Sequence, residues 1–522
     1  MRIERVRNAS RNMAYGVALQ AMKTLVPFAM RTVMLYLLGV EYLGLNSLFT
    51  SVLSVLNLAE LGVGSAMVYS MYRPIAEDDT RKICALMRLY KIYYRIIGLV
   101  VCVLGLLLVP FLPRLISGSV PPDVNLYVLY LLNLAATVFS YWLFAYRSSV
   151  LQAHQRNDVV SKVTLVTDTL KYLLQFAVLA IFRSYYLYVM AILGTQILNN
   201  ILTAVVAGRM YPEYRARGSL DRTERRSINH RIADLFTAKV GSVIVYSSDT
   251  IVISAFLGLS ALAIYQNYYY IFTAVTSVVT IVFTSVRAGL GNSIIVDGKE
   301  KVFADFRKFL LIIAWISGFC CACFLCLYQP FMVLWVGPDL LLDFGVVICL
   351  VVYFYVHCMN VFLNSYKDAA GMWHEDRFRP LVEALANLTL SIVLVQHIGL
   401  YGVVLSTILS MLLVAPWLVN NLFSLILDRR HLGQFARRMG YYALTALVTA
   451  VVTYGVCCLV NMAPAGTFVV RLVLCAFIAN LVIWAFVRRV PEYSDSLALI
   501  DRASGGRLGR LVALARRGMT RG

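Results

Sequence analysis

Long apolar stretches separated by short polar gaps run along almost the whole chain. A helix needs about 20 apolar residues to cross a bilayer core of about 30 Å. Fourteen stretches of roughly that length can be counted. They lie near residues 13–38, 43–68, 89–110, 124–146, 163–182, 187–207, 237–257, 263–286, 310–328, 344–366, 380–396, 403–427, 439–460 and 468–487. Because lipid cannot satisfy exposed backbone polar groups, the pattern predicts an all-α polytopic membrane protein with about 14 transmembrane helices.

Basic residues fall in every second gap. Most of the 47 Lys and Arg residues lie in these gaps, whereas the other gaps hold only Arg114 and Arg183. Cytoplasmic loops of membrane proteins carry the excess of Lys and Arg. The basic gaps are the amino terminus, the stretch after Tyr72, Tyr146–Lys162, Arg209–Arg231, Arg287–Lys308, Lys367–Arg379, Arg429–Arg438 and the tail from Arg488. We therefore expect a multi-pass protein of the cytoplasmic (inner or plasma) membrane with both termini in the cytoplasm.

Composition agrees with this assignment, since 60% of the residues are hydrophobic and only 14% are charged. The net charge of +20 needs no nucleic-acid partner, because its restriction to one side of the membrane is explained by orientation and by attraction to anionic lipids. The first apolar stretch contains Lys23 and Arg31 and no small-residue cleavage site, so we expect an uncleaved helix.

The chain contains eleven Cys, most of them inside apolar stretches, including Cys320, Cys321, Cys323 and Cys326. Metal ligation needs thiolates from segments that converge, and the sequence shows no such partners. These cysteines are interpreted as small packing residues. No metal site and no cofactor are expected.

The chain also repeats itself. Leu38 and Gly39 recur at an offset of 219 as Leu257 and Gly258, and the loops that start at Gln152 and Gly371 align at the same offset. Asn199-Asn200, near the end of the sixth stretch, matches Asn420-Asn421, near the middle of the twelfth, at an offset of 221.

An offset of six helices keeps both copies the same way up, so the repeat is parallel and its axis runs along the membrane normal. The predicted organisation is an N-lobe (1–208, helices one to six), a basic cytoplasmic linker (209–236), a C-lobe (237–427, helices seven to twelve), two further helices (428–487) and a basic cytoplasmic tail (488–522). Substrate sites in such proteins lie between the repeats near mid-membrane.

Polar residues at helical spacing indicate what lines that cavity. Asn46, Thr50, Ser54 and Asn57 form one stripe, with Glu60 at its edge. A second stripe on the eighth stretch comprises Thr273, Thr276, Ser277, Thr280, Thr284 and Arg287. Hydroxyls also serve as packing contacts between membrane helices, so both roles stay open for any single Ser or Thr.

Charges inside the apolar stretches are more discriminating, because each costs roughly 2.5–3.5 kcal/mol on insertion scales when central and unpaired. Asp168 and Lys171 are three residues apart and can pair locally. Lys239 lies near the end of its stretch and can snorkel to the headgroups or line the cavity.

Lys23, Pro27 and Arg31 follow at intervals of four on one helix face. The repeat places Arg31 level with Asp249, so these two residues could pair across the cavity in one state and leave Lys23 as uncompensated charge. Spare cationic charge favours an anionic substrate, with a phosphate or pyrophosphate as the natural partner of Lys and Arg.

The pattern from Arg7 to Gly39, the segment from Glu41 to Asn57 with its Leu-Gly-Leu core at 43–45, and the turn Leu151-Gln152-Ala153 resemble the polysaccharide-transporter (Wzx-type) flippases of the MOP superfamily, which also contains the MATE drug antiporters. The resemblance implies a MATE-like fold and transfer of an undecaprenyl-pyrophosphate-linked oligosaccharide across the membrane for O-antigen, capsule or exopolysaccharide assembly. It implies that Lys23 and Arg31 meet the pyrophosphate. A polysaccharide polymerase and chain-length machinery are the further partners it suggests.

The sequence contains no nucleotide-binding loop G-x-x-x-x-G-K-[ST] and no H-E-x-x-H zinc motif, so we expect a transporter rather than an enzyme. Energy would then come from an ion gradient or from consumption of the product, with Glu60, Asp168 and Asp249 as ion-coupling candidates. Two alternatives are a MATE-type drug exporter, which would want a more acidic cavity, and a membrane-embedded glycan polymerase or ligase, which would want larger outer loops.

Overall fold

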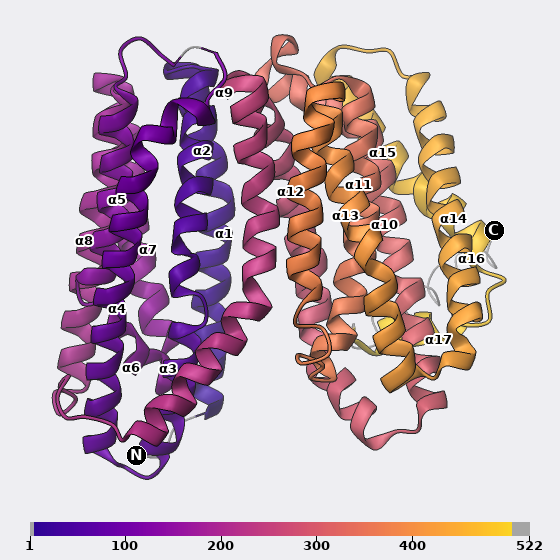
Figure 1. Cartoon of the computed structure of the whole chain (residues 1–522). Helices are drawn as coiled ribbons and strands as arrows, with labels where there is room; N and C mark the ends of the chain where they lie inside the picture. Colours follow the sequence, from indigo (N-terminus) through magenta and orange to yellow (C-terminus); the bar gives the residue numbers. More distant parts are fainter. Residues whose placement is uncertain (1–4, 119, 504–522) are drawn as a thin grey trace. The chain divides into compact units, whose positions relative to one another are not determined.

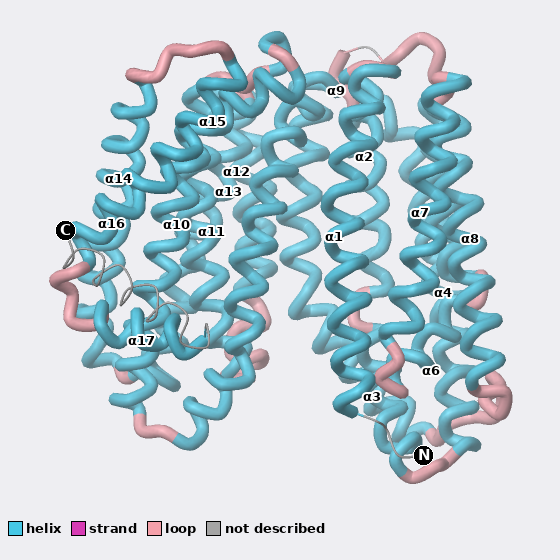
Figure 2. Tube along the Cα trace, turned by 180° about the vertical axis from the view of Figure 1, so that it is seen from behind, coloured by secondary structure: helices cyan, strands magenta, loops and turns pink. Residues whose placement is uncertain are grey.

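The computed structural model describes residues 5–118 and 120–503, and every regular element within them is helical (Figure 2). Of the expected tail at 488–522, residues 504–522 lie outside the described part. The chain divides into two compact units, Met1–Asn267 with Pro380–Val403 and Tyr268–Arg379 with Val404–Gly522. The predicted division into two six-helix lobes, a linker and a C-terminal pair stays a prediction.

The first unit contains most of the amino-terminal helices. They are α1 (Arg5–Leu37), α2 (Val40–Leu56), α3 (Val63–Ala76), α4 (Thr80–Leu108), α5 (Leu126–Trp142), α6 (Ser148–Ala153), α7 (Asn157–Phe182), α8 (Tyr185–Met210), the beginning of α9 (Arg222–Val296) and nearly all of α12 (Arg379–Ile398). Within this unit α1 packs on α7, α7 on α8, α8 on α5 and α5 on α4, so these long helices stand side by side (Figure 1).

The second unit contains the rest of α9 and most helices that follow. They are α10 (Lys299–Val336), α11 (Phe344–Ala369), α13 (Leu400–Leu422), α14 (Leu432–Cys458), α15 (Pro464–Leu474), α16 (Asn480–Val487) and α17 (Tyr493–Ala503). Here α10 is the central helix, because α11, α14 and α15 all pack against it.

Side-chain caps fix where several helices begin. Asp79 accepts a hydrogen bond from the backbone N–H of Lys82 at the start of α4, and Asn125 accepts one from Tyr127 at the start of α5. Asp343 does the same for Gly345 at the start of α11. These bonds satisfy N–H groups that have no partner inside the helix.

Among residues 5–118 and 120–503, eleven helices are long and apolar enough to cross a membrane, or twelve if the bent pair Leu126–Trp142 and Ala145–Ala153 forms one span. The expected count of 14 is not confirmed. One reason is that α9 counts once although it holds two expected stretches, which meet at the non-helical residue Gly258. The other is that α1, with Lys23 and Arg31 in it, is not among the eleven.

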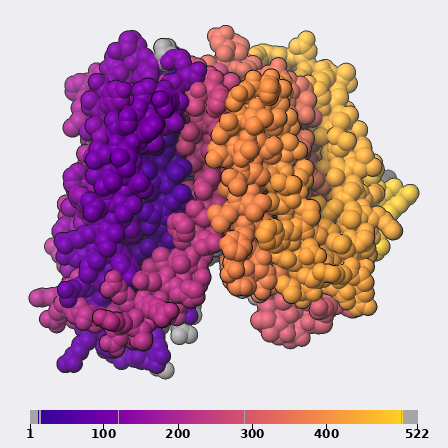
Figure 3. Space-filling view, viewed as in Figure 1, coloured from indigo at the N-terminus to yellow at the C-terminus, as the bar shows by residue number. Residues whose placement is uncertain are grey.

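The spans expose apolar side chains on the surface of the helix bundle, as contact with lipid requires. On α4, for example, Ile96, Leu99 and Val103 are about half exposed, with 51%, 55% and 47% of their surfaces accessible. Figure 3 shows one face of the first unit, with its early helices in indigo and purple.

The predicted repeat appears in the backbone. Gly39 has φ 114° and ψ 172°, and its counterpart in the second copy, Gly258, has φ 88° and ψ 176°. A second pair at the same offset, Gly118 and Gly337, has φ 85° and 89°. Such positive φ values favour glycine because it has no Cβ, so the matching glycines mark equivalent chain reversals.

A close helix contact within the first unit depends on another glycine, Gly44. A Cβ atom added to Gly44 of α2 would lie 2.2 Å from the carbonyl oxygen of Leu259 in α9. Only a residue without a side chain lets the two helices approach this closely.

Candidate functional site: polar side chains in the membrane spans

Arg31 lies on α1 and is half-buried. Its Nε donates a hydrogen bond to Oδ1 of Asn267, a fully buried residue of α9, over 2.7 Å. This bond orients the guanidinium toward α9. The sequence analysis missed Asn267, although an amide inside an apolar stretch was a signal that could have found it. The pairing of Arg31 with Asp249 stays a prediction.

Lys23 lies two turns before Arg31 on α1, and its side chain is exposed. No ion pair to Lys23 is seen among residues 5–118 and 120–503. Pro27 lies between the two cations within a continuous helix. Because proline has no N–H, the carbonyl of Lys23 receives no helical hydrogen bond from position 27. Lys239, on α9, is also exposed.

The two asparagines of the α2 stripe contact tyrosine hydroxyls. Tyr185 donates to Oδ1 of Asn46 over 3.3 Å, and Tyr141 donates to Oδ1 of Asn57 over 2.9 Å. The hydroxyls between them bond to their own helix instead. Those of Thr50 and Ser54 donate to backbone carbonyls four residues earlier.

Glu60 accepts hydrogen bonds from two tyrosines. Its Oε1 accepts from the Tyr94 hydroxyl over 2.7 Å, and its Oε2 accepts from the Tyr141 hydroxyl over 3.3 Å. Tyr90 extends the chain, because its hydroxyl donates to that of Tyr94 over 2.7 Å. All three tyrosines are buried. We call Glu60 with Tyr90, Tyr94 and Tyr141 the Glu60 network, and the sequence analysis identified only its carboxylate.

Local breaks in helical structure position the Glu60 network. Glu60 ends the short 3₁₀ turn η1 (Asn57–Glu60), and Gly62 follows with a φ of 89°. Tyr141 lies at the end of α5, just before a bend of 45° into the helical segment Ala145–Ala153. The break between α2 and α3 thus places the carboxylate beside the tyrosines of α4 and α5.

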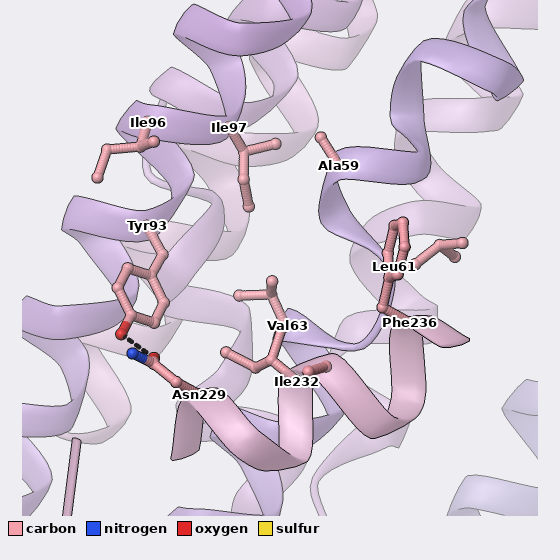
Figure 4. Close-up of a pocket in the computed structure, with 10 residues that line it drawn as sticks. Ala59, Leu61, Val63, Tyr93, Ile96, Ile97, Asn229, Ile232 and Phe236 are labelled. Atoms are coloured by element: carbon pink, nitrogen blue, oxygen red, sulfur yellow. Dashed lines mark hydrogen bonds between the residues drawn. The ribbon is translucent and has the colours of Figure 1, made fainter. Parts of the chain in front are cut away.

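A pocket of about 360 Å³ adjoins this break (Figure 4). Its walls are mostly apolar and come from η1, α3, α4 and the beginning of α9. At one edge the Tyr93 hydroxyl donates to Oδ1 of Asn229. The lining residues are Ala59, Leu61, Val63, Tyr93, Ile96, Ile97, Asn229, Ile232, Ala233 and Phe236.

The other two carboxylate candidates have different surroundings. Lys171 donates to Oδ1 of Asp168 over 2.8 Å, which confirms the local pairing expected from their spacing. Asp249 on α9 is buried, with 7% of its surface exposed. Asn387 of α12 lies 3.5 Å from Oδ1 of Asp249 and accepts a hydrogen bond from Ser248.

One expectation about the cysteines is wrong. The sequence analysis saw no converging partners for them, yet Cys326, Cys457 and Cys475 come together in the second unit. They are far apart in the sequence and lie on three different helical segments, so no local spacing could have revealed them.

The long apolar helices define a multi-pass membrane protein. Among solved structures, the chain is similar to one described as "Lipid II flippase MurJ, inward closed conformation", with a TM-score of 0.67, 13% identity, and coverage of 91% of this chain and 99% of that one. It is also similar to an inward-facing multidrug resistance MATE family transporter of the MOP superfamily, with a TM-score of 0.59, 14% identity, and coverage of 79% and 98%. At these identities the likeness establishes the MATE/MurJ-like fold.

The family follows from the sequence itself. The family described as "Polysaccharide biosynthesis protein" matches residues 9–287, which is more than half of the chain. The chain belongs to this family. Among curated proteins, no sequence match is found. The matched region includes α1 to α8 and nearly all of α9, and therefore Lys23, Arg31 and the Glu60 network.

Proposed function

We propose that the protein flips an undecaprenyl-pyrophosphate-linked oligosaccharide from the cytoplasmic to the outer leaflet for O-antigen, capsule or exopolysaccharide assembly. The observation that carries the proposal is the guanidinium of Arg31, held at 2.7 Å by Asn267 inside a chain of the polysaccharide biosynthesis family. The fold shared with a lipid II flippase supports a lipid-linked substrate.

Two cations on one helix suit a pyrophosphate. Lys23 and Arg31 are eight residues apart, which is about 12 Å along an α-helix. Long flexible side chains can converge from that separation on a group with two phosphates, and charge-assisted bonds to phosphate are among the strongest hydrogen bonds in proteins. Asn46, Asn57 and Lys239 are proposed to line the path of the sugars.

The proposed topology has fourteen membrane spans, and both termini lie in the cytoplasm. Alternating access by movement of one repeat against the other would then carry the headgroup across the membrane. A polymerase that uses the flipped unit and its chain-length machinery would act at the outer face.

Glu60 is our proposed coupling carboxylate. Asp168 already has a local partner, because the Lys171 ammonium lies 2.8 Å from its Oδ1. Glu60 is hydrogen-bonded to neutral tyrosine hydroxyls. A hydroxyl group can donate and accept, so it can hydrogen-bond to a carboxyl group in either protonation state. Glu60 is therefore surrounded by uncharged hydroxyl donors, whereas Asp168 is already held in an ion pair.

A flipping assay tests the function directly. The purified protein is reconstituted into vesicles that carry a fluorescent lipid-linked oligosaccharide, and an impermeant glycosidase reports how much of it becomes accessible with time. We expect the wild type and Arg114→Ala to flip the substrate and the double variant Lys23→Ala, Arg31→Ala to lose this activity. Arg114 is the matched control because it is an arginine outside the proposed path, with its guanidinium over the ring of Phe111.

Two results would contradict the proposal. Equal flipping by the double alanine variant would show that the two cations do not handle the headgroup. Extrusion of cationic dyes by the wild type, without flipping of the oligosaccharide lipid, would favour the drug-exporter alternative that the MATE-like fold also allows.

A further inference from the structure

We propose that Cys326, Cys457 and Cys475 form a binding site for a thiophilic metal ion, copper(I) or zinc, in the second unit. Cys326 belongs to α10, Cys457 to the end of α14, and Cys475 begins the π-helical turn η7 (Cys475–Ala479). All three side chains are fully buried, and their sulfur atoms lie within 4.8 Å of one another.

The spacing of the sulfur atoms suits a shared ion. Metal–sulfur bonds of about 2.3 Å place the ligands of one ion roughly 4 Å apart. The three thiols therefore need only small side-chain movements to bind together. Soft thiolate ligands select copper(I) or zinc over hard cations.

A fourth thiol and a guanidinium lie next to the three cysteines. Cys323, one turn before Cys326 on α10, packs against the cluster and could complete a four-sulfur zinc site. Arg471 lies one turn before Cys475, and its Nε is buried with no hydrogen-bond partner among the described residues. A cation at this place offsets the negative charge that several thiolates bring to one ion.

Packing alone does not account for the cluster. Cys358 is just as buried, yet it lies outside the group. Within residues 5–118 and 120–503, these three cysteines are the one group of three or more His, Cys, Asp or Glu side chains whose ligand atoms converge closely enough for an ion. π-Helical turns, such as the one that Cys475 begins, occur frequently at functional sites.

Metal binding would link α14 and η7 to α10, the central helix of the second unit. Each thiol that becomes a ligand releases one proton, so uptake of the ion should raise the acidity of a weakly buffered solution. The ion would join α14 and η7 to α10 and stabilise the folded chain in proportion to its affinity.

The test is metal content. The full chain is produced in medium supplemented with copper or with zinc, purified in detergent without chelators, and analysed for metal per protein by elemental mass spectrometry. We expect about one copper or zinc ion per chain in the wild type and in Cys358→Ser, and at least a tenfold lower content in Cys326→Ser and Cys475→Ser. Cys358→Ser is the matched control because it replaces an equally buried thiol with the same hydroxyl.

Other measurements separate the outcomes. X-ray absorption of the bound metal should show sulfur neighbours at about 2.3 Å, and loss of zinc in Cys323→Ser would distinguish a four-sulfur zinc site from a three-sulfur copper site. Metal removal should lower the melting temperature of the wild type and leave that of Cys475→Ala unchanged, provided this variant elutes as a folded monodisperse peak. The proposal would be overturned if the wild-type protein contained no metal after growth with either supplement. It would also be overturned if all variants contained the same amount of metal. A disulfide between two of the three cysteines in the native protein would also overturn it.

Discussion

Nε of Arg31 donates a hydrogen bond to Oδ1 of Asn267, which joins α1 to α9 inside the first unit. Without this acceptor the guanidinium would keep its charge and lose one of the contacts that orient it. This separates two contributions of Arg31, its charge and its orientation, which variants can test one at a time.

The first prediction concerns this bond. Asn267→Ala should reduce surface polysaccharide partially, whereas Arg31→Ala should abolish it, because the alanine at 267 removes only one hydrogen bond to a charged group, worth about 1.5–3 kcal/mol. Arg31→Lys should retain part of the activity. Surface polysaccharide is quantified in cells with equal amounts of each variant in the membrane. A wild-type level in Arg31→Ala would leave that residue as a structural charge.

The second prediction concerns the Glu60 network. Glu60→Gln keeps the size and an acceptor oxygen but cannot bind a proton at neutral pH, so uptake of protons coupled to substrate movement should stop. Tyr94→Phe should weaken the coupling, because it removes the 2.7 Å hydrogen bond to Oε1. Proton flux is followed with a pH-sensitive dye inside vesicles.

Tyr130→Phe is the control for these variants. Tyr130 is buried as well, but its hydroxyl donates to the carbonyl of Gly105 rather than to Glu60. Substrate-dependent proton uptake that persists in Glu60→Gln would exclude this residue as the coupling site and direct attention to Asp249.

The third prediction concerns Gly62, which has a φ of 89°. A Cβ atom there would lie 2.7 Å from that of Leu235 and 3.0 Å from the carbonyl oxygen of Ile232, both in α9. Gly62→Ala should therefore destabilise the protein by at least about 1–2 kcal/mol, the cost of a left-handed conformation with a side chain. The melting temperature in detergent measures it.

Gly194→Ala is the matched control, because Gly194 lies inside α8 with open space where its Cβ would be. An alanine there should leave the melting temperature unchanged or raise it slightly. If the two glycine variants had the same melting temperature, the close approach of α9 to Gly62 would not contribute to stability.

The fourth prediction concerns topology. Ser219 lies in the exposed stretch between α8 and α9, within the basic gap that we expect in the cytoplasm. A cysteine at Ser219 should resist an impermeant thiol reagent in intact cells and react after lysis, once the exposed Cys458 has been replaced. A cysteine at Asp339, in an expected outer gap, should react in both. Labelling of position 219 in intact cells would reverse the orientation.

The periodicity and the repeat of the sequence predicted the helical membrane fold and the paired turns. Both features depend on residues that are close together in the sequence. Gly39 and Gly258 show this well, since the leucine before each glycine recurs with it and the same backbone conformation follows. Local order also predicted the pairing of Asp168 with Lys171, but it did not predict partners that come from distant helices. Asn267 reaches Arg31 from 236 positions away, and only packing determines which polar side chain lies opposite.

The repeat even misleads where its copies differ. Asn57 begins the break between α2 and α3, whereas Thr276, its counterpart in the second copy, lies within α9 beyond the break at Gly258. The first copy therefore has a carboxylate site that the second copy does not reproduce, and symmetry gave no indication of it.

The contact at Gly62 has a mechanical consequence. From Arg222 to Leu257, α9 contains no non-helical residue, and its early turns pack closely against Gly62, two residues after Glu60. Adding a proton to Glu60 alters the bonds that hold the break between α2 and α3 in place. We therefore expect a change in the hydrogen bonds of Glu60 to be passed through Gly62 to α9.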